Sequence, residues 1–265
     1  MRLSVVTVCY NAEKTIADTI KSVLSQSYRD FEYVIVDGKS SDRTYDIVCE
    51  FEDEFTEKEI PFRHISEKDA GIFDAMNKAV KIAVGEWVCF INADDQLYDS
   101  DVLKSVFSEK LSEYDVIYGN VFRSGSAMSY IDKATPIEYI TLTMPFCHQS
   151  SFTRRELVEF DTEYLVADYK LFLKLYLDGK KFKQLDRTIA RYSVEGFSNQ
   201  NKYKTYLDVV RVKDEFGLVS QKSFKQKLKN QYHRIIIDEN AIGHSFLARI
   251  NKWITEKRKN GTKKQ

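Results

Sequence analysis

The sequence predicts an α/β protein with a doubly wound, mostly parallel β-sheet, and two observations lead to this prediction. Short runs of β-forming residues recur through the first hundred residues, each followed by turn residues and a segment of helical periodicity. This strand–helix alternation is typical of parallel sheets with helices on both faces. With 265 residues, the chain is long enough for one large α/β domain with an appendage, or for two small domains.

Four strands and three helices are expected in the first half of the domain. The strands are predicted over residues 3–10, 31–38, 62–65 and 87–92. The helices are predicted from about residue 12 to 25, after residue 42, and from about 71 to 84. Asn11 is placed to cap the first of these helices, because asparagine accepts hydrogen bonds from the first turn of a helix.

The pattern becomes less regular after residue 95. A helix near 99–111 leads to a β-rich run at 115–120, and the polar, aromatic stretch to about 145 has weak periodicity. A helical segment around 167–178 and a short β-like run at 186–192 follow. The domain boundary is expected near residue 200, which divides the chain into an α/β domain at 1–200 and a basic helical C-terminal extension at 201–265.

Charge is distributed unevenly along the chain, although the formal net charge is zero. Residues 221–265 contain twelve lysine and arginine residues and three acidic residues, so this tail carries +9 and the preceding body −9. Aromatic and apolar residues recur among the lysines at helical spacing, as in a helix that lies on an anionic membrane surface. A helix that packs on its own domain has the same pattern. No nucleic-acid partner is expected from a zero net charge.

The four cysteines, at positions 9, 49, 89 and 147, are scattered and form no Cys-x-x-Cys pair. This spacing argues against a structural zinc site and a secretory disulfide framework, and favours a reducing cytosol. No apolar run approaches the roughly 20 residues that a membrane span needs. We therefore expect a cytoplasmic protein, peripheral on the inner face of the plasma membrane if the tail binds lipid.

Two adjacent carboxylates, Asp94 and Asp95, follow the apolar run of the fourth predicted strand. Open α/β sheets bind their ligands at this carboxyl edge. Neighbouring carboxylates repel each other unless a cation lies between them, so the pair indicates Mg²⁺ or Mn²⁺ shared with substrate phosphates. The alternative interpretation is an ordinary turn, because Asn-Ala-Asp-Asp is also turn-forming.

Polar residues accompany the other predicted strands as well. Thr7 and Tyr10 lie in or after the first strand, Asp37 ends the second, and Asp69 follows the third. Because the ends of parallel strands are neighbours in space, these groups are expected to converge with the two carboxylates of the fourth strand. The chain contains neither a Gly-x-Gly-x-x-Gly fingerprint nor a P-loop, so a nucleotide would be held in another way.

Six segments, taken in order, carry a resemblance to a known family: SVVTVCYNAEKTIADTIKSVLSQSY, EYVIVDGKSSDRT, SEKDAGIFDAMNKAV, GEWVCFINADDQLY, FCHQSSFTRRELV and ADYKLFLKLYLDG. The chain resembles the family 2 glycosyltransferases, nucleotide-sugar enzymes of GT-A fold, from Leu3 to about Ser198. Within the family it looks most like the non-processive bacterial enzymes of polysaccharide and colanic-acid synthesis. The Gln-x-x-Arg-Trp signature of the processive synthases is absent.

The resemblance implies a site for a nucleoside-diphosphate sugar, with UDP as the expected nucleotide. Asp95 would hold Mn²⁺ or Mg²⁺ against the donor's diphosphate and so provide Lewis-acid catalysis. Within the donor site, Thr7 and Asp37 would line the base pocket, Asp69 would lie near the nucleoside and Asp94 would meet the ribose. Tyr10 belongs to the first donor loop. Gly38 stands where many relatives have a second acid, a departure that bears on recognition of the base.

Asp168, in ADYKLFLKL, matches the family's catalytic base at the start of a helix. An inverting transfer needs such a base on the acceptor side to take the proton of the attacking hydroxyl. An ordinary helix N-cap is the alternative interpretation. His148 and Gln149 match a His-Gln pair beside the family's active site. There His148 would contact the diphosphate or the metal, or serve as a structural hydrogen-bonding residue.

These features together predict a metal-dependent inverting glycosyltransferase that acts on a hydroxyl of a glycan or polyprenyl-linked acceptor in surface polysaccharide synthesis. One alternative is a nucleotidyltransferase, which also uses a metal on an α/β nucleotide fold. Such an enzyme would normally have a glycine-rich phosphate loop near the first strand, which is absent here. A catalytically silent nucleotide-sugar-binding protein is the other alternative, and the presence of both Asp95 and Asp168 argues against it.

Overall fold

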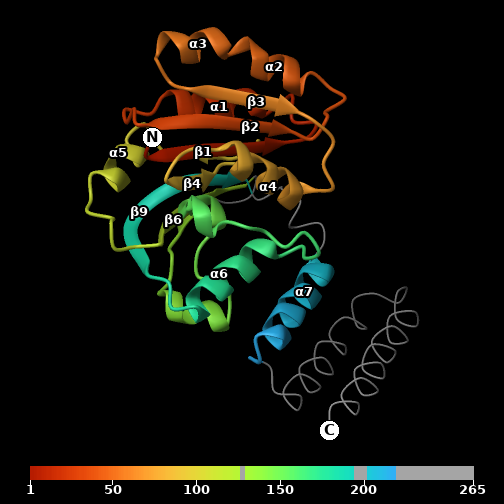
Figure 1. The fold of residues 1–265 in the computed structure, drawn as a ribbon, viewed down its shortest axis with the longest axis vertical. Helices are drawn as coiled ribbons and strands as arrows, with labels where there is room; N and C mark the ends of the chain where they lie inside the picture. Colours follow the sequence, from red (N-terminus) through yellow and green to blue (C-terminus); the bar gives the residue numbers. More distant parts are fainter. Residues whose placement is uncertain (126–128, 194–201, 219–265) are drawn as a thin grey trace. The chain divides into compact units, whose positions relative to one another are not determined.

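A computed structural model describes residues 1–125, 129–193 and 202–218 of the protein (Figure 1). The chain divides into two compact units, residues 1–212 and 213–265, and the fold described below is that of the first. The predicted boundary near residue 200 and the basic tail at 221–265 lie outside the described residues. The division into domains at 200 therefore stays a prediction.

A nine-stranded sheet forms the centre of the first unit (Figure 1). Its strands follow the order β3-β2-β1-β4-β8-β6-β9-β5, and β7 pairs with β6. Their bounds are β1 (Leu3–Cys9), β2 (Phe31–Asp37), β3 (Phe62–Ser66), β4 (Trp87–Phe90), β5 (Gln96–Leu97), β6 (Val116–Ser124), β7 (Tyr130–Asp132), β8 (Ser151–Arg154) and β9 (Phe182–Ser193). The strands β3, β2, β1 and β4 are mutually parallel, as predicted. Beyond them, β8 is antiparallel to both β4 and β6.

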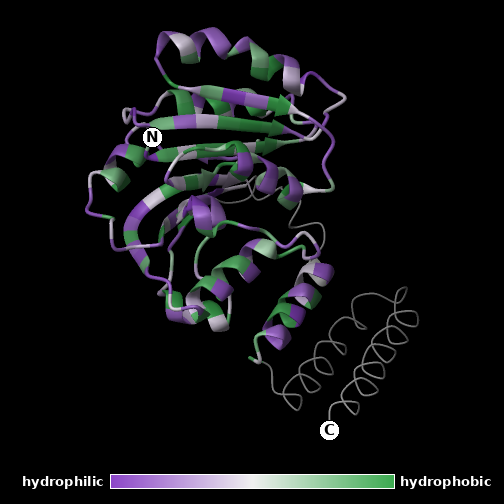
Figure 2. Ribbon diagram, viewed as in Figure 1, coloured by the Kyte–Doolittle hydropathy of each residue, from purple (hydrophilic) through white to green (hydrophobic). Residues whose placement is uncertain are grey.

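Helices connect the strands and cover the sheet. The α-helices are α1 (Ile16–Leu24), α2 (Thr44–Glu50), α3 (Glu52–Glu57), α4 (Ile72–Ile82), α5 (Val102–Phe107), α6 (Ala167–Leu177) and α7 (Lys202–Glu215). Three short 3₁₀ helices are η1 (Ile137–Thr141), η2 (His148–Ser150) and η3 (Arg155–Leu157). Hydrophilic residues run along much of α2 and α3 (Figure 2), as expected for helices with one solvent-facing side.

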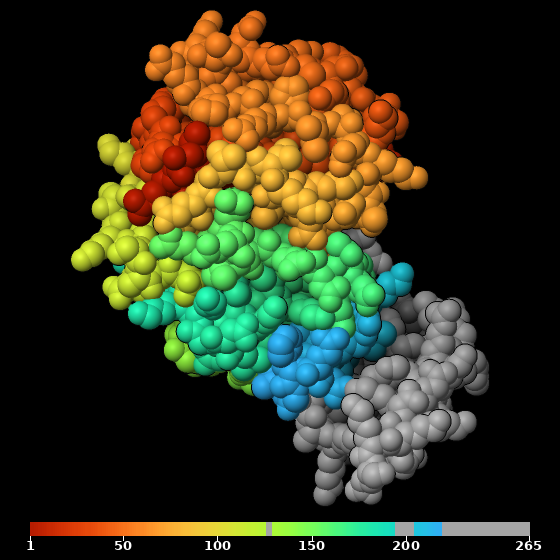
Figure 3. All heavy atoms as spheres, viewed as in Figure 1, coloured from red at the N-terminus to blue at the C-terminus, as the bar shows by residue number. Residues whose placement is uncertain are grey.

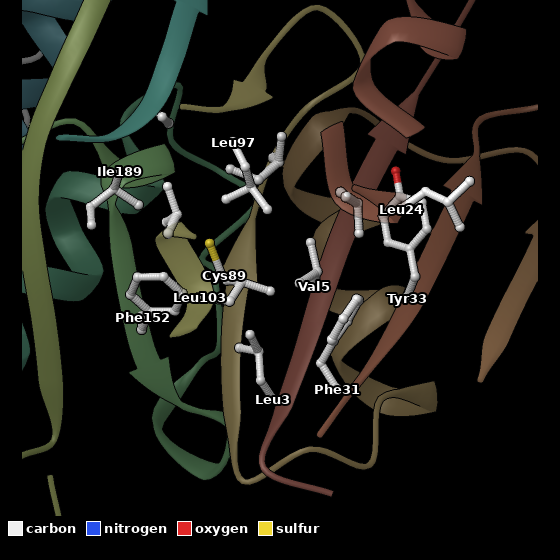
Figure 4. Close-up of a cluster of buried hydrophobic side chains, with 14 of the residues drawn as sticks. Leu3, Val5, Leu24, Phe31, Tyr33, Cys89, Leu97, Leu103, Phe152 and Ile189 are labelled. Atoms are coloured by element: carbon white, nitrogen blue, oxygen red, sulfur yellow. The ribbon is translucent and has the colours of Figure 1, made fainter. Parts of the chain in front are cut away.

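The central strands are buried on both faces, and every residue of β1, β2 and β4 is buried. On one face, Leu3 and Val5 of β1 pack in a large apolar cluster with Leu24 of α1 and Leu103 of α5 (Figure 4). The helix α4 contacts β1 and β2 and places Met76 in the core. Continuous burial of this kind is typical of parallel strands between two helical layers, so the predicted doubly wound architecture is confirmed.

The first helix begins four residues later than predicted, at Ile16, and Asn11 does not cap it. Asn11 adopts a positive φ of 50° instead, and its side-chain oxygen accepts a hydrogen bond from the main-chain N–H of Ser41 at 2.9 Å. The side chain therefore links two loops at the edge of the sheet. The second predicted helix is divided at Phe51 into α2 and α3.

A reciprocal hydrogen bond ties α4 to the second half of the domain. The side-chain amide of Asn77 donates to the carbonyl of Phe160 at 2.8 Å, and its oxygen accepts from the N–H of Phe160 at 2.9 Å. The rings of Phe73 and Phe160 also pack together, with centroids 5.3 Å apart. Figure 3 shows the gold surface of the first half directly against the green surface of the second. This contact holds the segment before α6 beside the carboxyl edge of the parallel strands.

Candidate active site

A cleft of about 1140 Å³ opens beside the carboxyl ends of β1 and β4. Its lining comes from segments far apart in the sequence: the loop after β1, the loop before α4, the turn after β4, and the region from β7 to the first turn of α6. Seven of the predicted site residues line this cleft, and they are Tyr10, Asp69, Asp94, Asp95, His148, Gln149 and Asp168. The expected convergence at the strand ends is thus present.

Asp95 is buried in the wall of the cleft, with 1% of its surface exposed. Its Oδ2 accepts a hydrogen bond from Nε2 of Gln149 at 3.0 Å, and Oδ1 accepts one from the main-chain N–H of Ser193 at 3.2 Å. Its carbonyl accepts from the hydroxyl of Thr19 at 2.7 Å, which fixes the turn after β4 to α1. Burial, together with the negative charge of Asp94, raises the pKa of Asp95 to about 8.

The neighbouring carboxylate, Asp94, lines the cleft, and loss of contact with solvent there raises its pKa as well. Among the described residues, both hydrogen-bond donors to Asp95 are neutral. A carboxylate oxygen that accepts one hydrogen bond still offers a lone pair to a cation. Mg²⁺ and Mn²⁺ take oxygen ligands and in such sites use one or two carboxylates together with substrate phosphates. This carboxylate pair therefore fits a divalent cation, and a cation would relieve the electrostatic cost of ionising both groups.

Gln149 is oriented by a residue that sequence reasoning did not single out. The Sγ of Cys147 lies 2.8 Å from Oε1 of Gln149. Burial, reinforced by the charge of Asp95, raises the pKa of the Cys147 thiol to about 12. The thiol therefore stays protonated and donates a hydrogen bond to the amide oxygen of Gln149. The amide nitrogen is then directed at Asp95. The only signal in the sequence is the spacing of two residues between the thiol and the amide.

Asp168 lies at the second position of α6, and Val166 occupies the N-cap position. No side chain caps this helix, so the interpretation of Asp168 as a helix cap is wrong. Its Oδ2 lies 3.3 Å from Nδ1 of His148, and the Asp168 side chain keeps 24% of its surface exposed. A carboxylate is therefore presented to the cleft from a different element than the pair after β4.

Thr7 is fully buried and does not line the cleft. Its hydroxyl donates to the carbonyl of Ile91 at 2.6 Å and lies 2.8 Å from the hydroxyl of Tyr33. These bonds connect β1 to the end of β4 and to β2. Thr7 therefore lies behind the cleft wall, where it supports the turn that carries the two carboxylates, and the role in the base pocket that the resemblance implies stays a prediction.

Asp37 is also fully buried and absent from the cleft lining. Its carboxylate accepts hydrogen bonds from the hydroxyl of Ser66 at 2.5 Å and from both the N–H, at 3.0 Å, and the hydroxyl of Ser40. The hydroxyl of Ser40 in turn accepts from the N–H of Asn11 at 2.8 Å. Asp37 thus holds the loop that follows Tyr10, and the role in the base pocket that the resemblance implies stays a prediction.

The absence of a side chain at Gly38 makes room for Asp69. A Cβ atom built on Gly38 would overlap Oδ2 of Asp69 and would lie 3.4 Å from the ring of Tyr10. The other oxygen of Asp69 accepts a hydrogen bond from the N–H of Gly71 at 2.9 Å, which fixes its position. A side chain at residue 38 would therefore require the carboxylate of Asp69 to move.

Comparison with known proteins gives the family of the chain. The model of the family described as glycosyl transferase family 2 matches residues 4–173. A PGL/p-HBAD biosynthesis glycosyltransferase of Mycobacterium tuberculosis is 30% identical over 220 residues, which cover 82% of this chain and 78% of that protein. The Escherichia coli UDP-Glc:alpha-D-GlcNAc-diphosphoundecaprenol beta-1,3-glucosyltransferase WfaP is 25% identical over 232 residues, which cover 82% and 87%.

Solved structures share the fold. Staphylococcus aureus TarS in complex with UDP-GlcNAc superposes with a TM-score of 0.65 at 22% identity, covering 80% of this chain and 65% of that one. The mannosyltransferase PcManGT from Pyrobaculum calidifontis, in complex with GDP-Man and Mn²⁺, gives a TM-score of 0.64 at 19% identity and covers 83% and 65%. The chain thus spans slightly less than two thirds of the length of these structures.

The fold is that of a GT-A glycosyltransferase. The chain belongs to glycosyltransferase family 2, as the family match over most of the domain and the mycobacterial relative show. This assignment favours glycosyl transfer over the nucleotidyl transfer considered from the sequence. In the described part of the chain, no helix has both the length and the apolar character needed to cross a bilayer.

Proposed function

We propose that this glycosyltransferase moves a sugar from a UDP-sugar to a hydroxyl of a glycan or lipid-linked acceptor in bacterial surface polysaccharide or glycolipid synthesis, with inversion at the anomeric carbon. The observation that carries the proposal is a single cleft lined by the carboxylate pair Asp94–Asp95 and by the separate carboxylate of Asp168. The name of WfaP, which specifies a UDP-glucose donor and a diphosphoundecaprenol acceptor, supports the donor and acceptor classes.

On the donor side, Asp95 and Asp94 would hold Mn²⁺ or Mg²⁺ together with the diphosphate. The cation would supply charge neutralisation for the departing nucleoside diphosphate. The network around Asp95 keeps its carboxylate in place, because Gln149 and Ser193 donate to its two oxygens. Preorganised ligands reduce the cost of ordering the site when the donor binds. The complex of PcManGT with GDP-Man and Mn²⁺ supports the use of a divalent cation.

The nucleoside would lie against Tyr10 and Asp69 at the end of the cleft formed by the first and third loops. Tyr10 is 64% exposed, and an exposed aromatic ring beside a cleft offers a flat surface for a base. Asp69 presents a carboxylate that accepts hydrogen bonds from N–H or hydroxyl groups. Uracil and ribose both carry such donors. Asp69 is therefore suited to hydrogen-bond the nucleoside, in place of the second acid that many relatives have at the position of residue 38.

On the acceptor side, Asp168 would take the proton of the attacking hydroxyl. Inversion requires the hydroxyl to approach the anomeric carbon from the side opposite the leaving diphosphate, so the base and the metal carboxylates must belong to different walls of the cleft. Asp168 comes from α6 and the pair comes from the turn after β4.

The experiment that tests the proposal is UDP release from a panel of UDP-sugars, each with Mn²⁺, with Mg²⁺ and with a chelator. We expect release from at least one UDP-sugar, dependent on the divalent cation. Binding of UDP-sugars without release, even in the presence of bacterial lipid-linked acceptors, would support the silent nucleotide-sugar-binding protein. Release of pyrophosphate from sugar phosphates and UTP would support a nucleotidyltransferase.

Gly38→Ala should weaken UDP binding by about tenfold, the scale of one hydrogen bond to a charged group. The added methyl group would displace the carboxylate of Asp69 and press on Tyr10, whereas the backbone of Gly38 can accept a side chain. Calorimetric titration with UDP and Mn²⁺ measures the effect. An affinity equal to that of the wild type would remove Asp69 from the nucleoside site.

We also propose that the basic tail at 221–265 attaches the enzyme to anionic membranes, where lipid-linked acceptors are found. The support is its net charge of +9 and the recurrence of aromatic residues among its lysines. The full-length protein should sediment with vesicles rich in phosphatidylglycerol at low salt and should dissociate as salt is raised, because each basic group near such a surface contributes about 1 kcal/mol that salt screens. Equal sedimentation with neutral vesicles would contradict an electrostatic attachment.

A further inference from the structure

The 3₁₀ helix η2 (His148–Ser150) places two neighbouring polar side chains against the carboxylates on both sides of the cleft. Nε2 of Gln149 donates to Asp95 at 3.0 Å, while Nδ1 of His148 lies 3.3 Å from Oδ2 of Asp168. The two side chains point to different carboxylates although they are adjacent in the sequence. A single short turn therefore contacts both the donor-side and the acceptor-side acid.

We propose that η2 is a positioning element: Gln149 holds the metal-binding carboxylate of Asp95, and His148 holds the proton-accepting carboxylate of Asp168. The proposal rests on the function proposed above and adds the residues that set the geometry of its two acids. His148 contacts neither the donor diphosphate nor the metal in this account. It acts through Asp168, to which it presents an N–H group.

The surroundings of His148 favour a proton on Nδ1. Nε2 is buried and has no hydrogen-bond partner among the described residues, so a proton there would be an unpaired buried donor. With its proton on Nε2 alone, the ring would direct the bare lone pair of Nδ1 at a carboxylate oxygen of Asp168. A proton on Nδ1 instead presents an N–H group to that oxygen, 3.3 Å away.

The contact between His148 and Asp168 is slightly longer than a typical hydrogen bond of 2.7–3.2 Å. Contacts between catalytic groups often tighten when the substrate binds. The turn itself is held firmly: the N–H of Ser150 donates to the carbonyl of Cys147 at 2.8 Å, and the hydroxyl of Ser151 donates to the carbonyl of His148 at 2.7 Å. The hydroxyl of Ser150 also donates to the carbonyl of Gly119 on β6, at 2.8 Å. A rigid turn anchored to the sheet is suited to fixing the directions of two side chains.

A positioning role also explains how Asp168 stays available to an acceptor. An aspartate in the first turn of a helix can bend back to the free N–H groups of that turn. No side chain caps α6, and Asp168 instead faces His148. One carboxylate oxygen would then be engaged by the imidazole while the other stays free for the acceptor hydroxyl. Without the imidazole, the carboxylate would have access to more rotamers and would spend less time facing the acceptor.

The test separates turnover from donor binding in two pairs of variants. His148→Leu should lower the kcat of UDP release from the UDP-sugar selected in the panel by roughly 10- to 100-fold, with UDP–Mn²⁺ affinity within about twofold of wild type. His148→Asn should recover most of the lost turnover, because the asparagine amide nitrogen occupies nearly the position of Nδ1. Gln149→Leu should instead weaken UDP–Mn²⁺ binding by about tenfold or more, as expected for loss of a group that supports a metal ligand.

A double-mutant cycle connects His148 to Asp168. In an Asp168→Asn background, His148→Leu should reduce turnover by less than about twofold further, because the group that it positions is already gone. An equal loss in both backgrounds would overturn the proposal, as would loss of UDP–Mn²⁺ binding in His148→Leu. If Asp168→Asn itself retained full turnover, the proposed base would be wrong. If Asp168→Asn lost turnover while His148→Leu kept the turnover of the wild type, only the positioning role of His148 would be overturned.

A spectroscopic readout tests the tautomer independently of activity and of variant folding. The chain contains four histidines, so ¹⁵N signals of the imidazoles are few and the His148 signal can be assigned with His148→Asn. We expect a proton on Nδ1 in the full-length protein, with a changed signal in Asp168→Asn. A ring without a proton on Nδ1, or a signal insensitive to Asp168→Asn, would overturn the proposal.

Discussion

Asp168→Asn is expected to lower turnover by on the order of 10²-fold or more, the scale of a missing general base, while UDP–Mn²⁺ binding persists. The amide has nearly the shape of the carboxylate but cannot take the proton of the acceptor hydroxyl. Because Asp168 lies on α6 and the proposed metal ligands lie in the turn after β4, the two functions should separate. Steady-state UDP release and calorimetric titration with UDP and Mn²⁺ measure them independently.

The matched control is Asp161→Asn. Asp161 also precedes the body of α6, but its carboxylate pairs with Lys170 at 2.7 Å and it does not line the cleft. That substitution removes a partly exposed ion pair and should leave turnover unchanged. Loss of UDP binding in Asp168→Asn would move Asp168 from the acceptor side to the nucleotide, and unchanged turnover would show that another group is the base.

Asp95→Asn is expected to abolish the metal-dependent part of UDP binding and, with it, transfer. A neutral amide is a poor ligand for Mg²⁺ or Mn²⁺ and cannot balance the charge of a cation between Asp94 and the diphosphate. Titration of the variant with UDP, with and without Mn²⁺, should give the same weak affinity. Asp99→Asn is the control, since Asp99 follows four residues later, pairs with Arg187 at 2.6 Å and lies outside the cleft lining. Full Mn²⁺-dependent transfer by Asp95→Asn would contradict the metal assignment.

In the metal-free protein, the buried carboxyl of Asp95 should make the free energy of unfolding depend on pH. The pKa of this group is about 8 in the folded protein and near 4 in the unfolded chain, so the folded state binds an extra proton between these values. The contribution of Asp95 to the free energy of unfolding therefore falls as the pH rises from 4 to 8, by at most about 1.4 kcal/mol per pH unit. Asp95→Asn lacks this loss. The free energy of unfolding of Asp95→Asn relative to that of the wild type should therefore rise between pH 5 and pH 8. A difference that does not change with pH would contradict the raised pKa of Asp95.

The parallel half of the sheet was predictable because its signals are local. Each of the strands β1, β2 and β4 is an apolar run that is buried throughout, and each helix between them repeats apolar residues at helical spacing. The start of α1 was missed because the side chain of Asn11 is used by a contact with Ser41, 30 residues away. A helix cap and a loop-to-loop bond require the same residue type, and only the fold decides between them.

The second half of the sheet was less predictable because its pairing is non-local. The two-residue strand β5 pairs with β9, across almost a hundred residues, and is too short to leave a periodic pattern. The strand β8 inserts between β4 and β6 in the antiparallel direction. The predicted run at 186–192 is part of the longer β9 (Phe182–Ser193), whose last residue donates to Asp95. No short-range sequence pattern predicts the hydrogen bond between Ser193 and Asp95.

The sequence indicated which strand ends carry chemistry, but it did not indicate which way each polar side chain points. Thr7 and Asp37 end in hydrogen bonds behind the cleft, because both faces of these strands are buried and a polar group on either face must find partners. Asp94 and Asp95 extend past the last strand residue, where the backbone turns toward the cleft. The orientation of Gln149 by Cys147 depends on a 3₁₀ turn, which the sequence did not indicate.

The measurement that tests the central claim most directly is anomalous diffraction from Mn²⁺ in a crystal grown with UDP. We expect one Mn²⁺ peak beside the carboxylates of Asp94 and Asp95, with UDP bound in the same cleft. Among the described residues, the other group that could hold a metal is Cys49, Glu52 and His64, which does not line the cleft. A peak at that group with none beside Asp95, or UDP bound outside the cleft, would contradict the proposed site.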